Sequence, residues 1–144
     1  MSDVERFLSL LEELRQALIV LARYRATVAR DRLLAEIDAQ NMVLFALYRA
    51  VQCSIDLGQH VIAERALPVP SAYREVFRAL GQAGVIDVTL AERMERWGGF
   101  RNVIAHQYGA LDIDRVARAL YEDLVDLEAF AATMAKILSD ESAH

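Results

Sequence analysis

The amino-acid sequence predicts an all-α protein, a helical bundle of about five helices, and three observations support this fold class. Apolar residues recur at steps of three and four along most of the 144 residues. Residues 3–57 contain no glycine or proline. No segment alternates apolar and polar residues as a half-buried strand does. A chain of this length is expected to form one domain over residues 1–144, with a core that needs neither disulfides nor metal.

The N-terminal half is predicted to contain two long helices. Residues 27–32 interrupt the helical periodicity with weak helix formers, so the first helix, which begins near Asp3, is expected to end there. The second helix is expected to end near Ala66, just before a proline-containing segment. The apolar positions that define these two helices are Val4, Phe7, Leu8, Leu11, Leu14, Leu18, Leu21, Leu33, Leu34, Ile37, Phe45, Tyr48, Val51 and Ile55.

Prolines separate the second helix from a short one. Pro68 and Pro70 each disfavour helix in the preceding residue, which ends the second helix. The hydroxyl of Ser71 is then expected to cap a short helix over about residues 72–80.

Glycines mark the next boundaries. Gly81 and Gly84 are expected to provide a helix C-cap and a turn. Either Asp87 or Thr89 caps the following helix, with Thr89 offering a capping box. That helix is predicted to end at Trp97, because two glycines follow it directly.

The C-terminal third contains one further helical segment and a final helix. Residues 100–108, with the sequence FRNVIAHQY, are predicted to be helical up to a break at Gly109. Asp112 or Asp114 then caps the last helix. The apolar set of this helix is Val116, Leu120, Leu124, Leu127, Phe130, Met134 and Ile137.

Composition narrows the classes of function. The formal net charge of −5 argues against indiscriminate coating of nucleic acid, which needs many cations, but it permits a focused cationic site. No apolar run approaches the ~20 residues of a membrane span, and the N-terminus lacks the features of a signal peptide. The lone Cys53 forms no internal disulfide, which favours a cytoplasmic protein. Because the three histidines lie far apart, we expect no metal site and no cofactor.

The segment FRNVIAHQY places an arginine, an asparagine, a histidine and a tyrosine within eight residues of a largely apolar chain. In a helix, Arg101 and His106 are five residues apart and point about 140° away from each other. Three arrangements bring them to one phosphate. The arginine side chain wraps round the helix, the helix ends near the histidine, or a second copy of the chain completes the site across a two-fold axis.

The chemistry that such a pair can perform is cleavage of RNA by its own 2′-hydroxyl. Imidazole takes up and releases protons near neutral pH, and a guanidinium stabilises the charge that accumulates on phosphoryl oxygens. No metal is needed for this reaction. On composition alone, however, a histidine among apolar residues is more often a hydrogen-bonded structural residue. In that alternative, Arg101 is simply a solvated residue at the end of a helix.

The same segment resembles the signature of HepT-like ribonuclease toxins of the HEPN superfamily, an arginine and a histidine in the form R-x4-H-x-Y. The likeness extends over nearly the whole chain, including ALYRAVQCSIDLGQHVIAERAL before the motif and YGALDIDRV after it. The resemblance implies a HEPN-type helical bundle that forms a homodimer. It also implies a metal-independent endoribonuclease toxin, with tRNA as one candidate substrate.

The resemblance further assigns roles to four residues. Arg101 and His106 match the catalytic pair, and Asn102 matches the polar residue that supports it. Tyr108 matches the tyrosine to which the antitoxin, a minimal nucleotidyltransferase (MNT) domain protein, adds AMP. An added nucleotide blocks an RNA site through its volume and its charge.

Two further groups of residues carry weaker signals. Four polar residues form a ridge along the second helix and either orient the pair or face solvent or a dimer partner: Gln52, Asp56, Gln59 and His60. Four arginines either guide RNA or an acidic partner or form a charged interhelical turn, and the turn is the commoner case: Arg23, Arg25, Arg30 and Arg32. Trp97 and Phe100 are expected to pack rather than to stack a base.

A function of a different class remains open at the level of sequence. A non-catalytic helical module that binds a nucleotide or a partner protein has the same bundle and uses Arg101 only to hold phosphate. The sequence motif does not separate this alternative from the nuclease.

Overall fold

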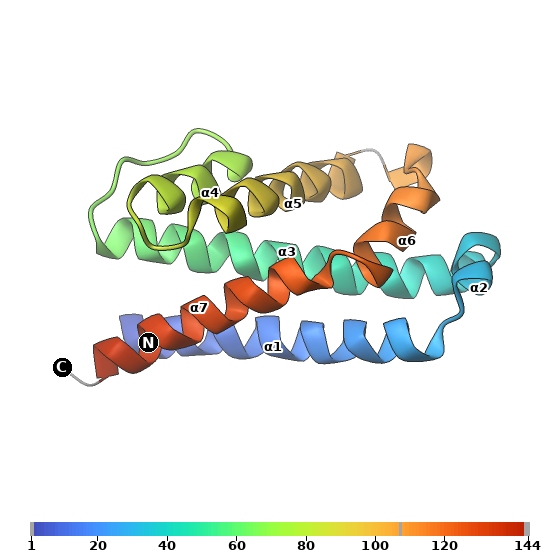
Figure 1. Cartoon of the computed structure of the whole chain (residues 1–144), viewed down its shortest axis with the longest axis horizontal. Coiled ribbons are helices and arrows are strands. Elements are labelled where there is room, and N and C mark those ends of the chain that lie inside the picture. Colours follow the sequence, from blue (N-terminus) through green and yellow to red (C-terminus); the bar gives the residue numbers. More distant parts are fainter. Residues whose placement is uncertain (1, 107, 143–144) are drawn as a thin grey trace.

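The computed structural model describes residues 2–106 and 108–142 of the chain, and over these residues the protein is all-α (Figure 1). The predicted fold class is confirmed, with seven α-helices in the described residues where about five were expected. The helices are α1 Asp3–Thr27, α2 Arg30–Ala35, α3 Ile37–Glu64, α4 Tyr73–Gln82, α5 Val88–His106, α6 Ile113–Tyr121 and α7 Leu124–Ser142; a short 3-10 helix, η1, spans Tyr108–Ala110.

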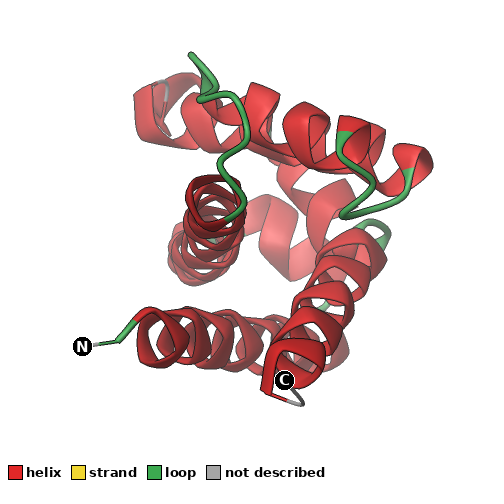
Figure 2. Cartoon of the chain, turned by 90° about the vertical axis from the view of Figure 1, so that its left-hand side faces the viewer, coloured by secondary structure: helices red, strands yellow, loops and turns green. Residues whose placement is uncertain are grey.

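Two long antiparallel helices, α1 and α3, form the base of the bundle (Figure 1). Helix α7 runs back along α1, so the two ends of the chain lie at the same end of the molecule. Helices α4 and α5 pack on each other and on α3, while α2 and α6 meet at the opposite end. Seen end-on in Figure 2, the described chain consists of helices joined by short loops. Helix α5, which carries the FRNVIAHQY segment, thus lies against the middle of the bundle.

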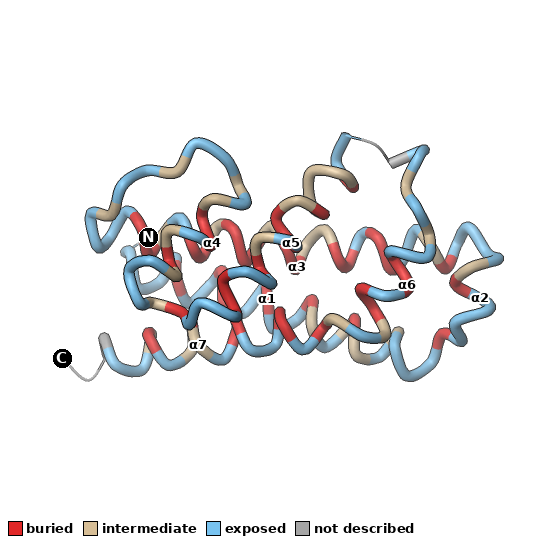
Figure 3. The backbone as a smooth tube through the Cα atoms, turned by 45° about the horizontal axis from the view of Figure 1, so that its top comes forward, coloured by how far each residue is buried: buried red, intermediate tan, exposed pale blue. Residues whose placement is uncertain are grey.

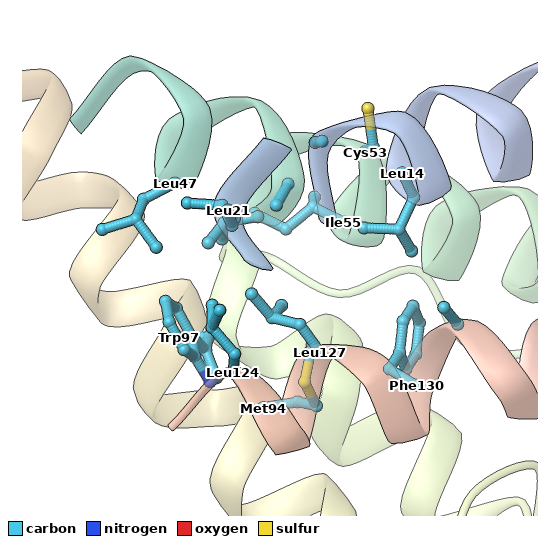
Figure 4. Close-up of a cluster of buried hydrophobic side chains, with 14 of the residues drawn as sticks. Leu14, Leu21, Leu47, Cys53, Ile55, Met94, Trp97, Leu124, Leu127 and Phe130 are labelled. Atoms are coloured by element: carbon cyan, nitrogen blue, oxygen red, sulfur yellow. The ribbon is translucent and has the colours of Figure 1, made fainter. Parts of the chain in front are cut away.

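The core lies where α1, α3, α5 and α7 face one another. The buried positions follow the inward faces of these helices (Figure 3). Removal of each such large apolar side chain from water contributes about 1.5–3 kcal/mol. The cluster drawn in Figure 4 combines residues from all four helices: Leu14, Leu21, Leu47, Ile55, Met94, Trp97, Leu124, Leu127 and Phe130.

The predicted break at Gly98–Gly99 is wrong, because α5 continues through both glycines to His106. Neighbouring helix α4 explains their presence. A Cβ atom added at Gly98 would lie 3.0 Å from the Arg74 Cα, and one at Gly99 would lie 3.1 Å from an Arg74 guanidinium nitrogen. The glycines therefore permit α4 to approach α5 closely, and this packing outweighs the low helix propensity of glycine.

The last predicted helix is in fact two helices, α6 and α7. Glu122 leaves helical geometry with φ −122° and ψ −30°. This break lets α6 pack on α2 and α3 while α7 runs along α1, which one straight helix cannot do. The hydroxyl of Tyr121 fixes the end of α6 by donating to the Val28 carbonyl, between α1 and α2.

The helix caps resolve the alternatives that the sequence left open. Asp87, not Thr89, caps α5, since its Oδ1 accepts from the Leu90 N–H at 2.8 Å. Asp112, not Asp114, caps α6. Gly84, with φ of +75°, forms the turn after α4 as predicted, but the C-cap of α4 is Ala83, and Gly81 lies inside the helix.

The predicted cap at Ser71 is wrong. The N-cap of α4 is Ala72, which makes no side-chain cap hydrogen bond. Ser71 instead donates to Glu75 Oε2 from its hydroxyl at 2.7 Å and from its backbone N–H at 3.2 Å. The carboxylate of Glu75 is therefore the acceptor at this helix start, and the hydrogen bonds from Ser71 lower its pKa.

Among the described residues, none of the helices combines the length and the apolar character that crossing a membrane requires.

The thiol of Cys53 is predicted to be inert in the folded protein. Cys53 is 7% exposed on α3, and burial together with the Glu13 carboxylate raises its pKa to about 12, from 9.0. Since the folded pKa is the higher one, this thiol stabilises the fold below about pH 9 and the contribution is lost as the pH rises towards 12. At pH 8 we expect Ellman's reagent to modify the native chain about 100-fold more slowly than the chain unfolded in guanidinium. Equal rates in the two states would contradict this.

Candidate functional site

Arg101 lies on the face of α5 that is turned towards α3, and it is half-buried there. Its guanidinium donates three hydrogen bonds. The Nε donates to Gln52 Oε1 at 2.9 Å, and the two terminal nitrogens donate to the Tyr48 hydroxyl and to Asn102 Oδ1, each at 3.3 Å. The charged group is thus held at one place between two helices.

Two tyrosine rings enclose the same guanidinium. The Arg101 Cζ lies 4.6 Å from the ring centre of Tyr73 and 5.5 Å from that of Tyr48. Such contacts contribute about 0.5–1 kcal/mol each and restrict the plane of the guanidinium. Tyr73 is the first residue of α4 and directly precedes Arg74, the residue that packs on Gly98 and Gly99. The two glycines therefore determine how close Tyr73 comes to Arg101.

Part of the polar ridge on α3 supports this arrangement. Gln52 donates from its Nε2 to Asp56 Oδ1 at 2.9 Å, which leaves its Oε1 directed at Arg101. We call Arg101 with Tyr48, Gln52, Tyr73 and Asn102 the Arg101 cluster. Of the ridge, Gln52 contacts Arg101 directly and Asp56 acts through Gln52.

His60 belongs to a different part of the molecule. Its ring lies 5.4 Å from the Phe7 ring of α1. The Nε2 of His60 lies 3.4 Å from Glu64 Oε2, a distance that fits an ion pair. The geometry of this approach does not meet the criteria for a hydrogen bond. The hydrogen bond that the sequence permits between Asp56 and His60 is therefore replaced by an approach to Glu64.

His106 is the last residue of α5 and is exposed. The hydrogen bonds described for Arg101 go to α3 and to Asn102, with none to His106. Of the three arrangements left open by the sequence, the helix does end at the histidine, but the arginine turns towards α3 instead of wrapping towards it. One chain thus supplies both groups, from the same end of α5, without direct contact between them.

The remaining predicted site residue, Tyr108, is two residues after His106 in the sequence and begins the 3-10 helix η1. Its side chain lies outside the described part of the structure. Asn102, which the resemblance names as a supporting residue, accepts from Arg101.

An apolar groove of about 390 Å³ lies beside the Arg101 cluster, between α3 and the end of α5. Tyr48 contributes to both the groove and the cluster. Phe45 is 66% exposed, which is unusual for a phenylalanine, and Ile37 and Met42 on α3 are exposed as well. The groove is lined by Asn41, Leu44, Phe45, Tyr48, Ile104 and Ala105.

Three of the four arginines within residues 23–32 form ion pairs, and Arg23 lies over the ring of Tyr24. Arg25 pairs with Glu128 at 3.5 Å, Arg30 with Glu122 at 3.6 Å and Arg32 with Glu36 at 2.5 Å. Glu36 and Glu122 are the C-cap residues of α2 and α6, and Glu128 lies on α7. These contacts favour the interpretation of the cluster as a charged turn that ties helices together.

Trp97 and Phe100 are buried, with their rings 5.8 Å apart in an edge-to-face arrangement. Packing, not base stacking, is their role in this chain. Sequence reasoning missed Tyr73 altogether and counted Tyr48 only as an apolar position. A tyrosine in a helical period carries no local signal of the arginine that it meets, so only the packing of α4 and α3 on α5 identifies both.

Comparisons with known proteins identify the family and the fold. A family model described as Ribonuclease HepT-like matches residues 14–134. The mRNA nuclease HepT of Shewanella oneidensis is 30% identical over 91 residues, which cover 63% of this chain and 68% of that protein.

Two solved structures share the fold. A tri-AMPylated HEPN toxin of Shewanella oneidensis, solved in complex with an MNT antitoxin, superposes with a TM-score of 0.82 at 21% identity, over 94% of this chain and 99% of that one. The cytosolic protein YutE of Bacillus subtilis superposes with a TM-score of 0.76 at 16% identity, over 96% and 90%. At these identities the structural likeness establishes the fold alone.

Proposed function

Because this chain belongs to the HepT-like ribonuclease family, we propose that it is a metal-independent endoribonuclease toxin that cleaves RNA with Arg101 and His106. The single observation that carries the proposal is the geometry of Arg101. Four side chains on three helices hold its guanidinium at the surface of α5, and an exposed imidazole ends the same helix. A purely structural arginine does not require a histidine at the adjoining helix end.

The reaction follows from these two groups. The 2′-oxygen of the substrate attacks the neighbouring phosphorus, the bond to the 5′-oxygen breaks, and the 2′-proton passes in net terms to that leaving oxygen. His106 mediates this proton transfer. Arg101 stabilises the charge on the non-bridging oxygens, and its fixed partners reduce the reorganisation needed in the transition state. The products are a 2′,3′-cyclic phosphate and a 5′-hydroxyl.

A homodimer completes this site in the proposal. The apolar groove and the exposed Phe45 adjoin the Arg101 cluster at Tyr48, and an exposed apolar surface beside a polar site is typical of a subunit interface. Isologous pairing through this surface brings two arginines and two histidines near one axis. An Arg101 and a His106 that point apart in one chain then face one substrate from two chains.

The experiment that tests the function uses purified protein and RNA in EDTA. We expect cleavage of single-stranded RNA, with 2′,3′-cyclic phosphate at the new ends. Both tRNA and mRNA are offered, since the Shewanella oneidensis relative is named as an mRNA nuclease. Intact RNA of both kinds after incubation with folded dimer contradicts the nuclease and favours the non-catalytic module, in which Arg101 only holds phosphate.

We propose that the ring of Tyr73 positions the Arg101 guanidinium, and two substitutions of different size test this role. Tyr73→Ala removes the ring nearest to the guanidinium and is expected to lower kcat about 2- to 5-fold with little change in KM, since the stacking is worth about 0.5–1 kcal/mol. Tyr73→Phe keeps the ring and is expected to restore most of the rate. A phenylalanine variant as slow as the alanine variant contradicts positioning by stacking.

The proposed partner is an MNT-domain antitoxin that inactivates the chain by adding AMP to Tyr108. Co-expression with the nucleotidyltransferase is expected to add the mass of one or more AMP groups to the wild-type chain and none to Tyr108→Phe, as measured on the intact protein. Modified protein is expected to lose RNA cleavage, because the added phosphate and base occupy the region beyond His106. An unmodified wild type that is nevertheless inhibited indicates control by complex formation instead.

A further inference from the structure

A pocket of about 500 Å³ lies on another side of α5, between this helix and the junction of α6 with α7. Four arginines line it, two from each of two helices: Arg93, Arg96, Arg115 and Arg118. The rings of Trp97 and Phe100 form its buried floor. We call this site the arginine pocket.

The acidic residues of the pocket are mostly neutralised by other partners. Asp126 accepts from Arg93 at 3.3 Å and from the Trp97 indole at 3.3 Å. Glu122 pairs with Arg30, which belongs to α2 and lies outside the pocket lining. These pairs account for two carboxylates and for one of the four arginines.

The remaining charges leave the pocket cationic. Arg96, Arg115 and Arg118 face one further carboxylate, that of Asp123. Burial, together with the nearby Asp126 and Glu122, raises the pKa of Asp123 despite the two neighbouring arginines. Three guanidinium groups with one such partner form a concave site suited to phosphate.

The arginine pocket is connected to the Arg101 cluster through α5. The Arg115 guanidinium lies 4.9 Å from the ring centre of Phe100, the residue that directly precedes Arg101. Arg96 is five residues before Arg101, a rise of about 7.5 Å along the helix. The pocket therefore lies within about two helical turns of Arg101 but on another face of α5, so a single strand that contacts both sites bends round the helix.

We infer that the arginine pocket binds the phosphate backbone of the RNA substrate beside the cleaved bond, an inference that rests on the nuclease function proposed above. A chain with a net charge of −5 gains affinity for RNA only through focused cations. The arginines of residues 25–32 are occupied by acidic partners, whereas Arg96, Arg115 and Arg118 surround an open pocket. Its buried rings offer no stacking face, so the pocket recognises phosphate rather than base.

The test measures binding of a 2′-O-methylated single-stranded RNA, which the proposed reaction cannot cleave. Fluorescence anisotropy compares wild type, the double variant Arg96→Gln/Arg118→Gln and the control Arg78→Gln, which removes one exposed arginine that pairs with Glu95. We expect the double variant to bind about 10-fold more weakly, with a salt slope reduced by about 1.4, or ~0.7 for each lost phosphate contact. The control is expected to stay within about twofold of wild type.

Several outcomes separate the pocket from the nuclease function. An unchanged affinity and salt slope in a double variant with a native circular dichroism spectrum overturns the pocket. Loss of antitoxin binding with unchanged RNA binding also overturns it and makes the surface a protein interface. Lysine substitutions at both positions keep the charge and are expected to restore most of the affinity. If the wild type cuts no RNA but the double variant still binds RNA more weakly, the result supports RNA binding by the pocket and contradicts the nuclease function.

Discussion

Replacement of His106 by alanine is expected to reduce RNA cleavage in EDTA by about 10²- to 10⁴-fold, the range for loss of a general acid or base. The imidazole is exposed at the last residue of α5 and packs into no part of the core, so its removal leaves the helix and its contacts in place. The rate is measured on labelled RNA under single-turnover conditions, and thermal unfolding monitors the fold. Wild-type and variant melting temperatures are expected to agree closely.

The matched control for this variant is Arg78→Ala, an exposed change on α4 that is expected to leave the rate unaltered. A pH–rate profile adds a second readout. If His106 mediates proton transfer, the pH dependence of the cleavage rate differs between the variant and the wild type. A His106→Ala chain that cleaves as fast as wild type removes the histidine from the mechanism.

Replacement of Arg101 by lysine is expected to lower the cleavage rate by about 10²- to 10³-fold even though the positive charge is kept. Lysine has one ammonium group in place of the planar guanidinium. It cannot hydrogen-bond Gln52, Tyr48 and Asn102 at their observed positions and also stack on the Tyr73 ring. The charge therefore loses its fixed position, and the loss should appear in kcat more than in KM.

The control for the arginine variant is Arg78→Lys, the same chemical change at an exposed ion pair with Glu95, and it is expected to be neutral. Binding of the 2′-O-methylated RNA provides a second measurement, because a lysine at position 101 is expected to retain most of the ground-state affinity. A lysine variant with wild-type kcat contradicts a role for the guanidinium geometry.

The sequence predicted the helical class and most helix ends because these depend on neighbouring residues. The apolar period, the two prolines before α4 and the caps at Asp87 and Asp112 act within one or two turns of chain. The prediction of a break at Gly98–Gly99 was wrong because the outcome there depends on a contact with another helix. Helix propensity is a local preference of about 1 kcal/mol for glycine, and the packing of α4 across α5 outweighs it.

The candidate site was likewise predicted only in part from the sequence. The motif placed Arg101 and His106 on one helix end, which follows from their spacing. The partners of the arginine did not follow from spacing, since Tyr48 lies 53 residues away along the chain and reaches the guanidinium only across the α3–α5 contact. The arginine pocket was missed because its arginines come from α5 and α6, which only the fold brings together, and because the apolar pattern concealed the break between α6 and α7 at Glu122.

By itself the sequence determined that this chain is helical, where most helices begin and end, and that Arg101 and His106 lie near the end of one helix. Only the tertiary structure decided that Arg101 turns to α3 between two tyrosines, that α5 continues through its glycines and that further arginines meet behind Phe100. The physical reason is the distance along the chain over which each effect acts. Periodicity and capping act over a few residues, whereas the direction of a half-buried side chain is set by whichever distant helix packs against it.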